Sequence, residues 1–90
     1  MSTFIASRVS SDQNALYPDM IEIDEFNIIY YKGHVFGYST IIIAKRNLAS
    51  VSLSSGLFFA DVVISSKGGE MIIARGFSKS SAKEILRILS

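Results

Sequence analysis

The periodicity of the apolar residues changes once along this 90-residue chain, and that change limits the choice of folds more than any other feature. Residues 20 to 76 carry short apolar runs or apolar residues at every second position, which is typical of β-strands. In the tail SKSSAKEILRILS, four apolar residues recur at helical spacing instead, namely Ala82, Ile85, Leu86 and Leu89. The sequence therefore predicts a series of strands followed by one amphipathic helix.

Turn-forming residues separate the predicted strands. Lys32-Gly33-His34 is expected to form a turn, and the glycines Gly68-Gly69 favour a hairpin with a three-residue loop, Lys67 to Gly69. The expected strands span residues 3–9, 20–24, 26–32, 36–44, 48–54, 57–66 and 70–76, and the expected helix spans residues 79–89.

The loop at Lys67 to Gly69 also predicts a register, because a slip by one residue would reverse the faces of one strand relative to the other. The preferred register lets Asp61 and Arg75 neutralise each other, whereas the slipped one sets Val62 opposite Arg75. The predicted pairs are Phe59 with Phe77, Asp61 with Arg75 and Val63 with Ile73 on one face, and Val62 with Ala74 and Ile64 with Ile72 on the other.

Two residues compete for the start of the helix. Ser81 with Glu84 matches a capping box, whereas Ser78 as the N-cap would place Phe77 to pack against Ala82. In either case the helix is too short to be stable alone, so we expect its apolar face to be buried.

Seven consecutive strands without intervening helices exclude a parallel α/β sheet, because parallel neighbours need long crossover connections. The predicted fold class is mainly β (α+β). We expect antiparallel strands in a bent sheet, either a partly open barrel or two nearly orthogonal sheets. The helix would then plug one open end through Ala82, Ile85, Leu86 and Leu89.

Several segments resemble the bacterial pleckstrin-homology-like domains. They are IEIDEFNIIYYKG, the strand LASVSL after a short basic corner, the Gly-Gly hairpin and the tail GFSKSSAKEILRIL, which together span roughly residues 19 to 89. The resemblance implies a seven-stranded bent sheet capped by a C-terminal helix in a single domain, residues 1–90. It also implies a small interaction module, since several members of that family self-associate.

Several strands are apolar on both faces, and 49% of the residues are hydrophobic. One barrel takes only alternate residues inward, so the others form an exposed patch. We expect a homo-oligomer, or a complex with another protein, through a face that contains Ile29, Tyr31, Ile42 and Phe59. The alternative is that the N-terminal segment, residues 3–9, covers this face.

Composition and motifs argue against catalysis and against nucleic-acid binding. The net charge is +1, cysteine is absent, and His34 is the single histidine, so we expect no catalytic, metal or cofactor-binding residues. No GxSxG, P-loop or GxGxxG motif occurs. The lack of cysteine and of an apolar leader or membrane-spanning run suggests a soluble, cytoplasmic protein.

Basic residues near the predicted turns suggest a second function, the binding of an anion or of an acidic membrane surface. The residues that would make this contact are Lys32, His34 and Lys67. Lys45 and Arg46 would lie at the far end of the strand 36–44, and we interpret them as a charged strand corner.

Overall fold

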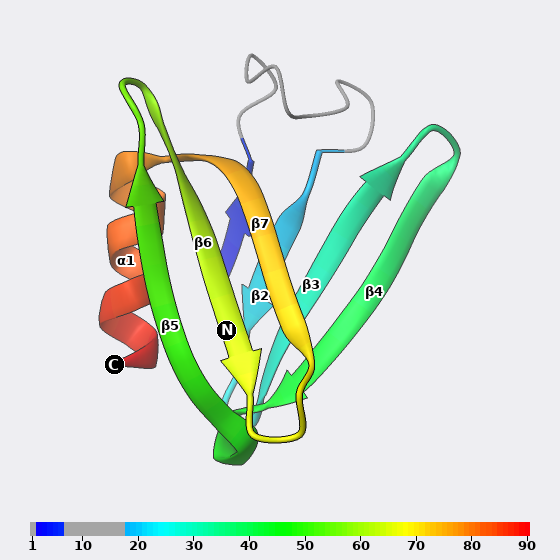
Figure 1. The fold of residues 1–90 in the computed structure, drawn as a ribbon. Coiled ribbons are helices and arrows are strands. Elements are labelled where there is room, and N and C mark those ends of the chain that lie inside the picture. Colours follow the sequence, from blue (N-terminus) through cyan, green and yellow to red (C-terminus); the bar gives the residue numbers. More distant parts are fainter. Residues whose placement is uncertain (1, 7–17) are drawn as a thin grey trace.

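A computed structural model describes residues 2–6 and 18–90, which form seven strands and one α-helix (Figure 1). The strands are antiparallel, as the sequence predicts, and they are arranged in two sheets. In chain order the elements are β1 (Ser2–Ile5), β2 (Met20–Ile23), β3 (Asn27–His34), β4 (Gly37–Ala44), the 3₁₀ turn η1 (Lys45–Asn47), β5 (Leu48–Ser55), β6 (Phe59–Ser66), β7 (Met71–Ser78) and α1 (Lys79–Leu89).

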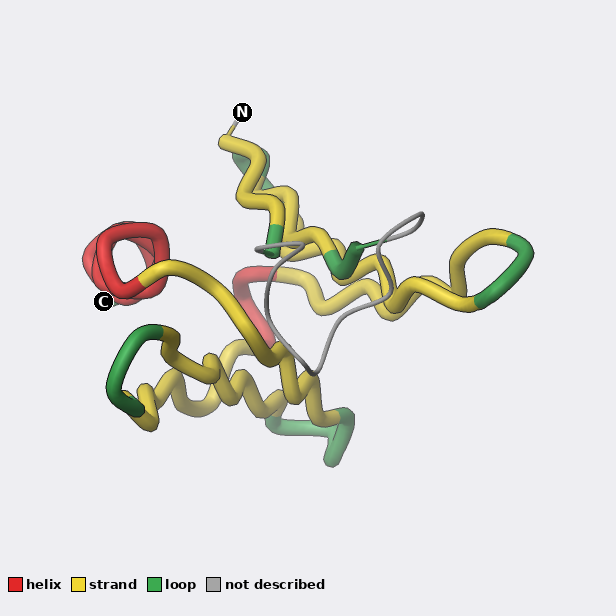
Figure 2. Tube along the Cα trace, turned by 90° about the horizontal axis from the view of Figure 1, so that it is seen from above, coloured by secondary structure: helices red, strands yellow, loops and turns green. Residues whose placement is uncertain are grey.

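Both sheets are meanders in which strands that follow each other in the chain are paired. Sheet A has the order β1-β2-β3-β4 and sheet B has the order β5-β6-β7. The two sheets lie face to face without closing into a barrel, and α1 lies beside the opening between them (Figure 2). The fold is therefore mainly β with a C-terminal helix, and of the two predicted arrangements the structure has the two sheets.

The positions of two turns differ from the prediction. The strand predicted from residue 57 begins at Phe59, so Leu57 and Phe58 belong to the β5–β6 loop. β3 continues to His34, and the loop between β3 and β4 consists of Val35 and Phe36 rather than Lys32-Gly33-His34. The turn lies farther along the chain because Gly37, not Gly33, provides the positive φ, which is 134°. Gly33 instead pairs with Tyr38 as a regular residue of the β3–β4 ladder. The helix bounds are confirmed, and residues 7–9 of the predicted first strand lie outside the described residues.

The register between β6 and β7 confirms the prediction near the hairpin and contradicts it farther away. Beyond Val62 the ladder contains a β-bulge, in which Arg75 and Gly76 together oppose Asp61. The predicted pair of Phe59 with Phe77 is therefore wrong, and Asp61 faces both Arg75 and Gly76 in the bulge rather than forming the predicted regular pair with Arg75. The observed pairs are Ile64 with Ile72, Val63 with Ile73, Val62 with Ala74, Ala60 with Phe77 and Phe59 with Ser78.

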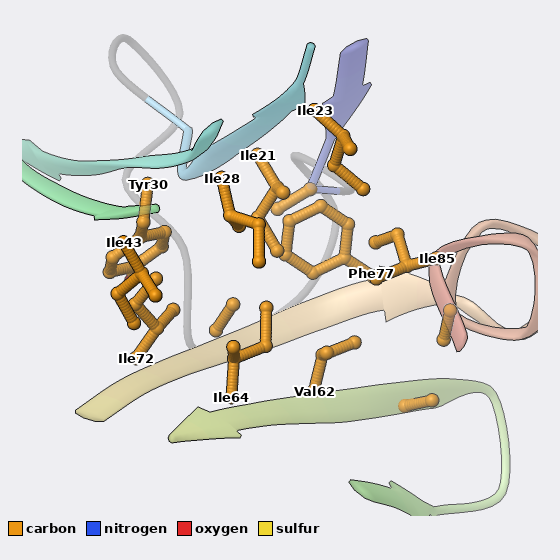
Figure 3. Packing of buried hydrophobic residues seen from close by; sticks show 14 residues of the cluster. Ile21, Ile23, Ile28, Tyr30, Ile43, Val62, Ile64, Ile72, Phe77 and Ile85 are labelled. Carbon is orange, nitrogen blue, oxygen red and sulfur yellow. The ribbon is translucent and has the colours of Figure 1, made fainter. Parts of the chain in front are cut away.

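This bulge turns Phe77 into the core. In an unbroken strand Phe77 would alternate with the buried residues and face outward. Gly76 accommodates the extra residue with a φ of 79°, and its N–H donates to Asp61 Oδ1 at 3.3 Å. Phe77 is fully buried as a result, and Figure 3 shows its ring between Ile21 and Ile85.

The core lies between the sheets and continues onto α1. Ser78 is the N-cap, since its hydroxyl accepts a hydrogen bond from the Ser81 N–H at 3.2 Å. Of the predicted plug, Ala82 and Ile85 are fully buried and Leu89 packs against the core, together with Ile88, whereas Leu86 is half-buried. The buried residues are Ala6, Ile21, Ile23, Ile28, Tyr30, Ile43, Ala60, Val62, Ile64, Ile72, Ala74, Phe77, Ala82 and Ile85.

Ile85 is buried and Leu86 is half-buried, so truncating these two side chains should lower the stability by different amounts. Ile85→Ala should lower the free energy of unfolding by about 2–5 kcal/mol, because it leaves a cavity beside Phe77. Leu86→Ala, a similar truncation of a half-buried side chain, should cost less than half as much. Urea unfolding followed by circular dichroism measures both, and equal losses would mean that the helix does not pack through Ile85.

Candidate functional site

The outer face of sheet A is the side of the sheet that points away from the core, and it is largely apolar. It consists of two rows that run across all four strands, plus Tyr38 of β4. The first row is Thr3, Glu22, Ile29 and Ile42, and the second is Ile5, Met20, Tyr31 and Thr40.

The apolar side chains of this outer face remain accessible. Ile42 is 56% exposed, Ile5 54% and Tyr38 39%, while Ile29 and Tyr31 are half-buried. The rings of Tyr31 and Tyr38 meet edge to face with centroids 6.1 Å apart. The neighbouring strands thus share one continuous apolar surface, rather than carrying scattered single residues.

One carboxylate lies within this apolar surface. Glu22 occupies the first row, diagonally across from Tyr31. Loss of hydration around the ring and the negative charge of Glu22 both raise the pKa of Tyr31 above its usual value. The Tyr31 hydroxyl is thus a polar neighbour of the Glu22 carboxylate within this apolar surface.

The structure brings together three of the four residues predicted for the self-association face. Ile29, Tyr31 and Ile42 lie on the outer face of sheet A, but Phe59 is in β6 of sheet B and pairs with Ser78. The sequence analysis missed Ile5, Met20 and Tyr38. All three lie in predicted strands, but only the pairing of the strands shows that they share the outer face.

A buried carboxylate lies on the inner side of sheet A. Asp19 is 2% exposed, and its carboxylate accepts a hydrogen bond from the Tyr30 hydroxyl at 2.6 Å and one from the Gly33 N–H at 2.9 Å. Lys32 Nζ lies 3.4 Å from the same carboxylate. The Asp19 main-chain oxygen also accepts from the Ala6 N–H at 2.8 Å, so Asp19 joins the ends of β1, β2 and β3.

This cluster also connects the two sheets. The Tyr30 oxygen lies 3.4 Å from the carbonyl oxygen of Ile73 in β7. Burial of the ring, together with the hydrogen bond to the Asp19 carboxylate, raises the pKa of Tyr30 far above its usual value. The hydroxyl is thus a permanent donor at any pH near neutrality. These contacts satisfy a buried charge, and we interpret the cluster as structural.

The three predicted anion-binding residues do not form one site. Lys32 is half-exposed and lies beside Asp19, and His34 Nε2 is 2.7 Å from the Ser39 hydroxyl. Lys67 belongs to the β6–β7 hairpin, where its N–H donates to the Asn47 carbonyl at 2.7 Å. Figure 1 places that hairpin at the opposite end of the molecule from the β3–β4 hairpin.

Two further features concern the described part of the chain. Among residues 2–6 and 18–90, no group of three or more histidine, aspartate or glutamate side chains is arranged to hold a metal ion. Within the same residues, no helix has the length and apolar character required to cross a bilayer.

No protein-family model, curated protein or solved structure matches this chain. The resemblance to bacterial pleckstrin-homology-like domains therefore stays a prediction, based on the order of the elements and the quoted segments.

The buried Tyr30 predicts a dependence of stability on alkaline pH. Above about pH 10 the unfolded chain loses the tyrosine proton while folded Tyr30 keeps it, so stability falls by up to about 1.4 kcal/mol per pH unit. Tyr30→Phe should remove this part of the slope, while lowering stability at neutral pH by about 1–3 kcal/mol through the lost donor to Asp19.

Urea unfolding at several pH values between about 9 and 11 measures this slope. Tyr38→Phe is the control, because it removes a hydroxyl from an exposed ring of the same sheet. If the stability of Tyr30→Phe falls with pH as steeply as that of the unchanged protein, Tyr30 is not the source of this pH dependence.

Proposed function

We propose that this domain is a non-catalytic protein-interaction module, of the pleckstrin-homology-like type, that self-associates through the outer face of sheet A. The observation that carries the proposal is the continuity of that face, where Ile29, Tyr31 and Ile42 lie beside Ile5, Met20 and Tyr38. Association would remove this surface from water, at a gain of roughly 25 cal/mol for each Å² of apolar area buried.

The composition of β4 supports a second copy as the partner. β4 is an edge strand of sheet A, and its sequence GYSTIIIA contains no charged residue and no proline. Natural sheets usually protect long edge strands with charges, proline or a bulge. β5 and β7, by contrast, each pair with β6 through an irregular register. Two copies can therefore approach at β4 without repulsion between like charges.

Anion binding by Lys32, His34 and Lys67 receives less support. Lys32 lies against the Asp19 carboxylate, which already offsets its charge, and Lys67 lies at the other end of the domain. A net charge of +1 gives little general attraction to an acidic surface.

The proposal predicts a loss of association when a charge enters the outer face of sheet A. Ile42→Lys replaces a side chain that is 56% exposed, so the fold should be retained while the buried interface becomes unfavourable. We expect the unchanged protein to sediment as a dimer or larger species at tens of micromolar, and Ile42→Lys to sediment as a monomer.

Ile73→Lys is the matched control, since Ile73 is 46% exposed but lies on sheet B. It should leave association unchanged. Sedimentation equilibrium at several protein concentrations gives the masses. A monomeric unchanged protein, or equal effects of both substitutions, would overturn the proposal.

A further inference from the structure

Two hairpin tips present adjacent large apolar residues to solvent. The β3–β4 tip carries Val35, 64% exposed, and Phe36, 96% exposed. The β5–β6 tip carries Leu57, 81% exposed, and Phe58, 74% exposed. These four are among the most exposed large apolar residues of the described chain, and none of them belongs to the outer face of sheet A.

Both tips project from the same end of the domain. Figure 1 shows the β3–β4 and β5–β6 hairpins rising at one end, while the β6–β7 hairpin and η1 lie at the other. Seen along that direction, the two apolar tips lie on opposite sides of the molecule (Figure 2). They therefore cannot cover each other, and they form two separate protrusions.

The residues at these tips contradict the usual chemistry of turns. Two-residue hairpin loops favour asparagine, aspartate and glycine, because these residues tolerate the backbone angles and interact well with water. Val35 and Phe36 offer neither property. The β6–β7 hairpin, with Lys67, Gly68 and Gly69, follows the rule. Departures from a local rule without a folding benefit occur mainly at functional positions.

Basic residues lie close to each tip. His34 directly precedes the first tip. Pairing of Phe59 with Ser78 brings Lys79, the first residue of α1, next to the second tip. The segments from residue 33 to 38 and from residue 55 to 60 contain no acidic residue.

We propose that the two apolar tips insert into the interface of a lipid bilayer with anionic headgroups. Phe36 and Phe58 would enter the boundary between headgroups and acyl chains, while Lys79 and His34 remain at the level of the phosphates. Two separate convex tips fit this partner, because a bilayer accepts apolar residues at any lateral spacing. A protein partner would need two pockets at one fixed distance.

The chain contains no tryptophan, so a single introduced tryptophan reports its own surroundings without background. Phe36→Trp and Phe58→Trp report on the two tips. Phe26→Trp is the matched control, since Phe26 is 69% exposed in the β2–β3 turn and its carbonyl accepts from the Lys45 N–H at the opposite end of the domain.

The probes are vesicles of phosphatidylcholine with phosphatidylserine, with and without bromine-labelled acyl chains. We expect the emission of Phe36→Trp and Phe58→Trp to shift to shorter wavelength and to be quenched by the brominated lipid, with no change for Phe26→Trp. Equal quenching of all three, or of none, would overturn the proposal.

A second measurement needs no probe. The double substitution Phe36→Ser with Phe58→Ser should weaken vesicle partitioning at least about tenfold, and Phe26→Ser should not. Since these side chains are exposed, circular dichroism should show an unchanged fold. Unchanged partitioning of the double variant would also overturn the inference.

Sedimentation without lipid separates this inference from the proposed self-association. The double variant should keep the mass of the unchanged protein, and Ile42→Lys should still bind vesicles. If the double variant instead becomes monomeric, the tips contact a second copy and the membrane inference is wrong.

Discussion

Burial of one apolar face of each sheet against the other is the interaction on which the rest of the structure depends. No strand of sheet A is paired with a strand of sheet B in the described chain, so side chains hold the two layers together. Phe77 of sheet B is central to this core, because its ring lies between Ile21 of sheet A and Ile85 of α1 (Figure 3). The bulge at Gly76 is what turns it inward, and α1 then closes that side of the core through Ala82 and Ile85.

The polar cluster around Asp19 lies where β3 and β7 approach each other. A buried carboxylate is costly unless hydrogen bonds and a counter-charge satisfy it. Tyr30, Gly33 and Lys32 provide these, and the backbone of Asp19 holds the end of β1 through Ala6. The same contacts hold Lys32 against a carboxylate, which explains why a lysine near a hairpin does not amount to an anion site.

Self-association through the outer face of sheet A would strengthen membrane binding through the apolar tips. The outer face of sheet A and the apolar tips use different residues, so one molecule can self-associate and approach a membrane at once. An oligomer whose tips reach the same bilayer would bind through several weak contacts, and its retention would exceed that of a single copy. This arrangement suits a domain with a small net charge, since apolar insertion rather than long-range attraction would supply the affinity.

The sequence alone determined the elements and their order. Alternating apolar residues predicted the strands, and the helical spacing from Ala82 to Leu89 predicted the helix with its confirmed bounds. It could not predict the bulge at Gly76, because the bulge depends on the partner strand, nor that Phe59 lies apart from Ile29, Tyr31 and Ile42. Periodicity reveals which residues share a face of one strand. Which faces lie side by side is decided only by the pairing of strands, and that pairing depends on contacts between residues far apart in the chain.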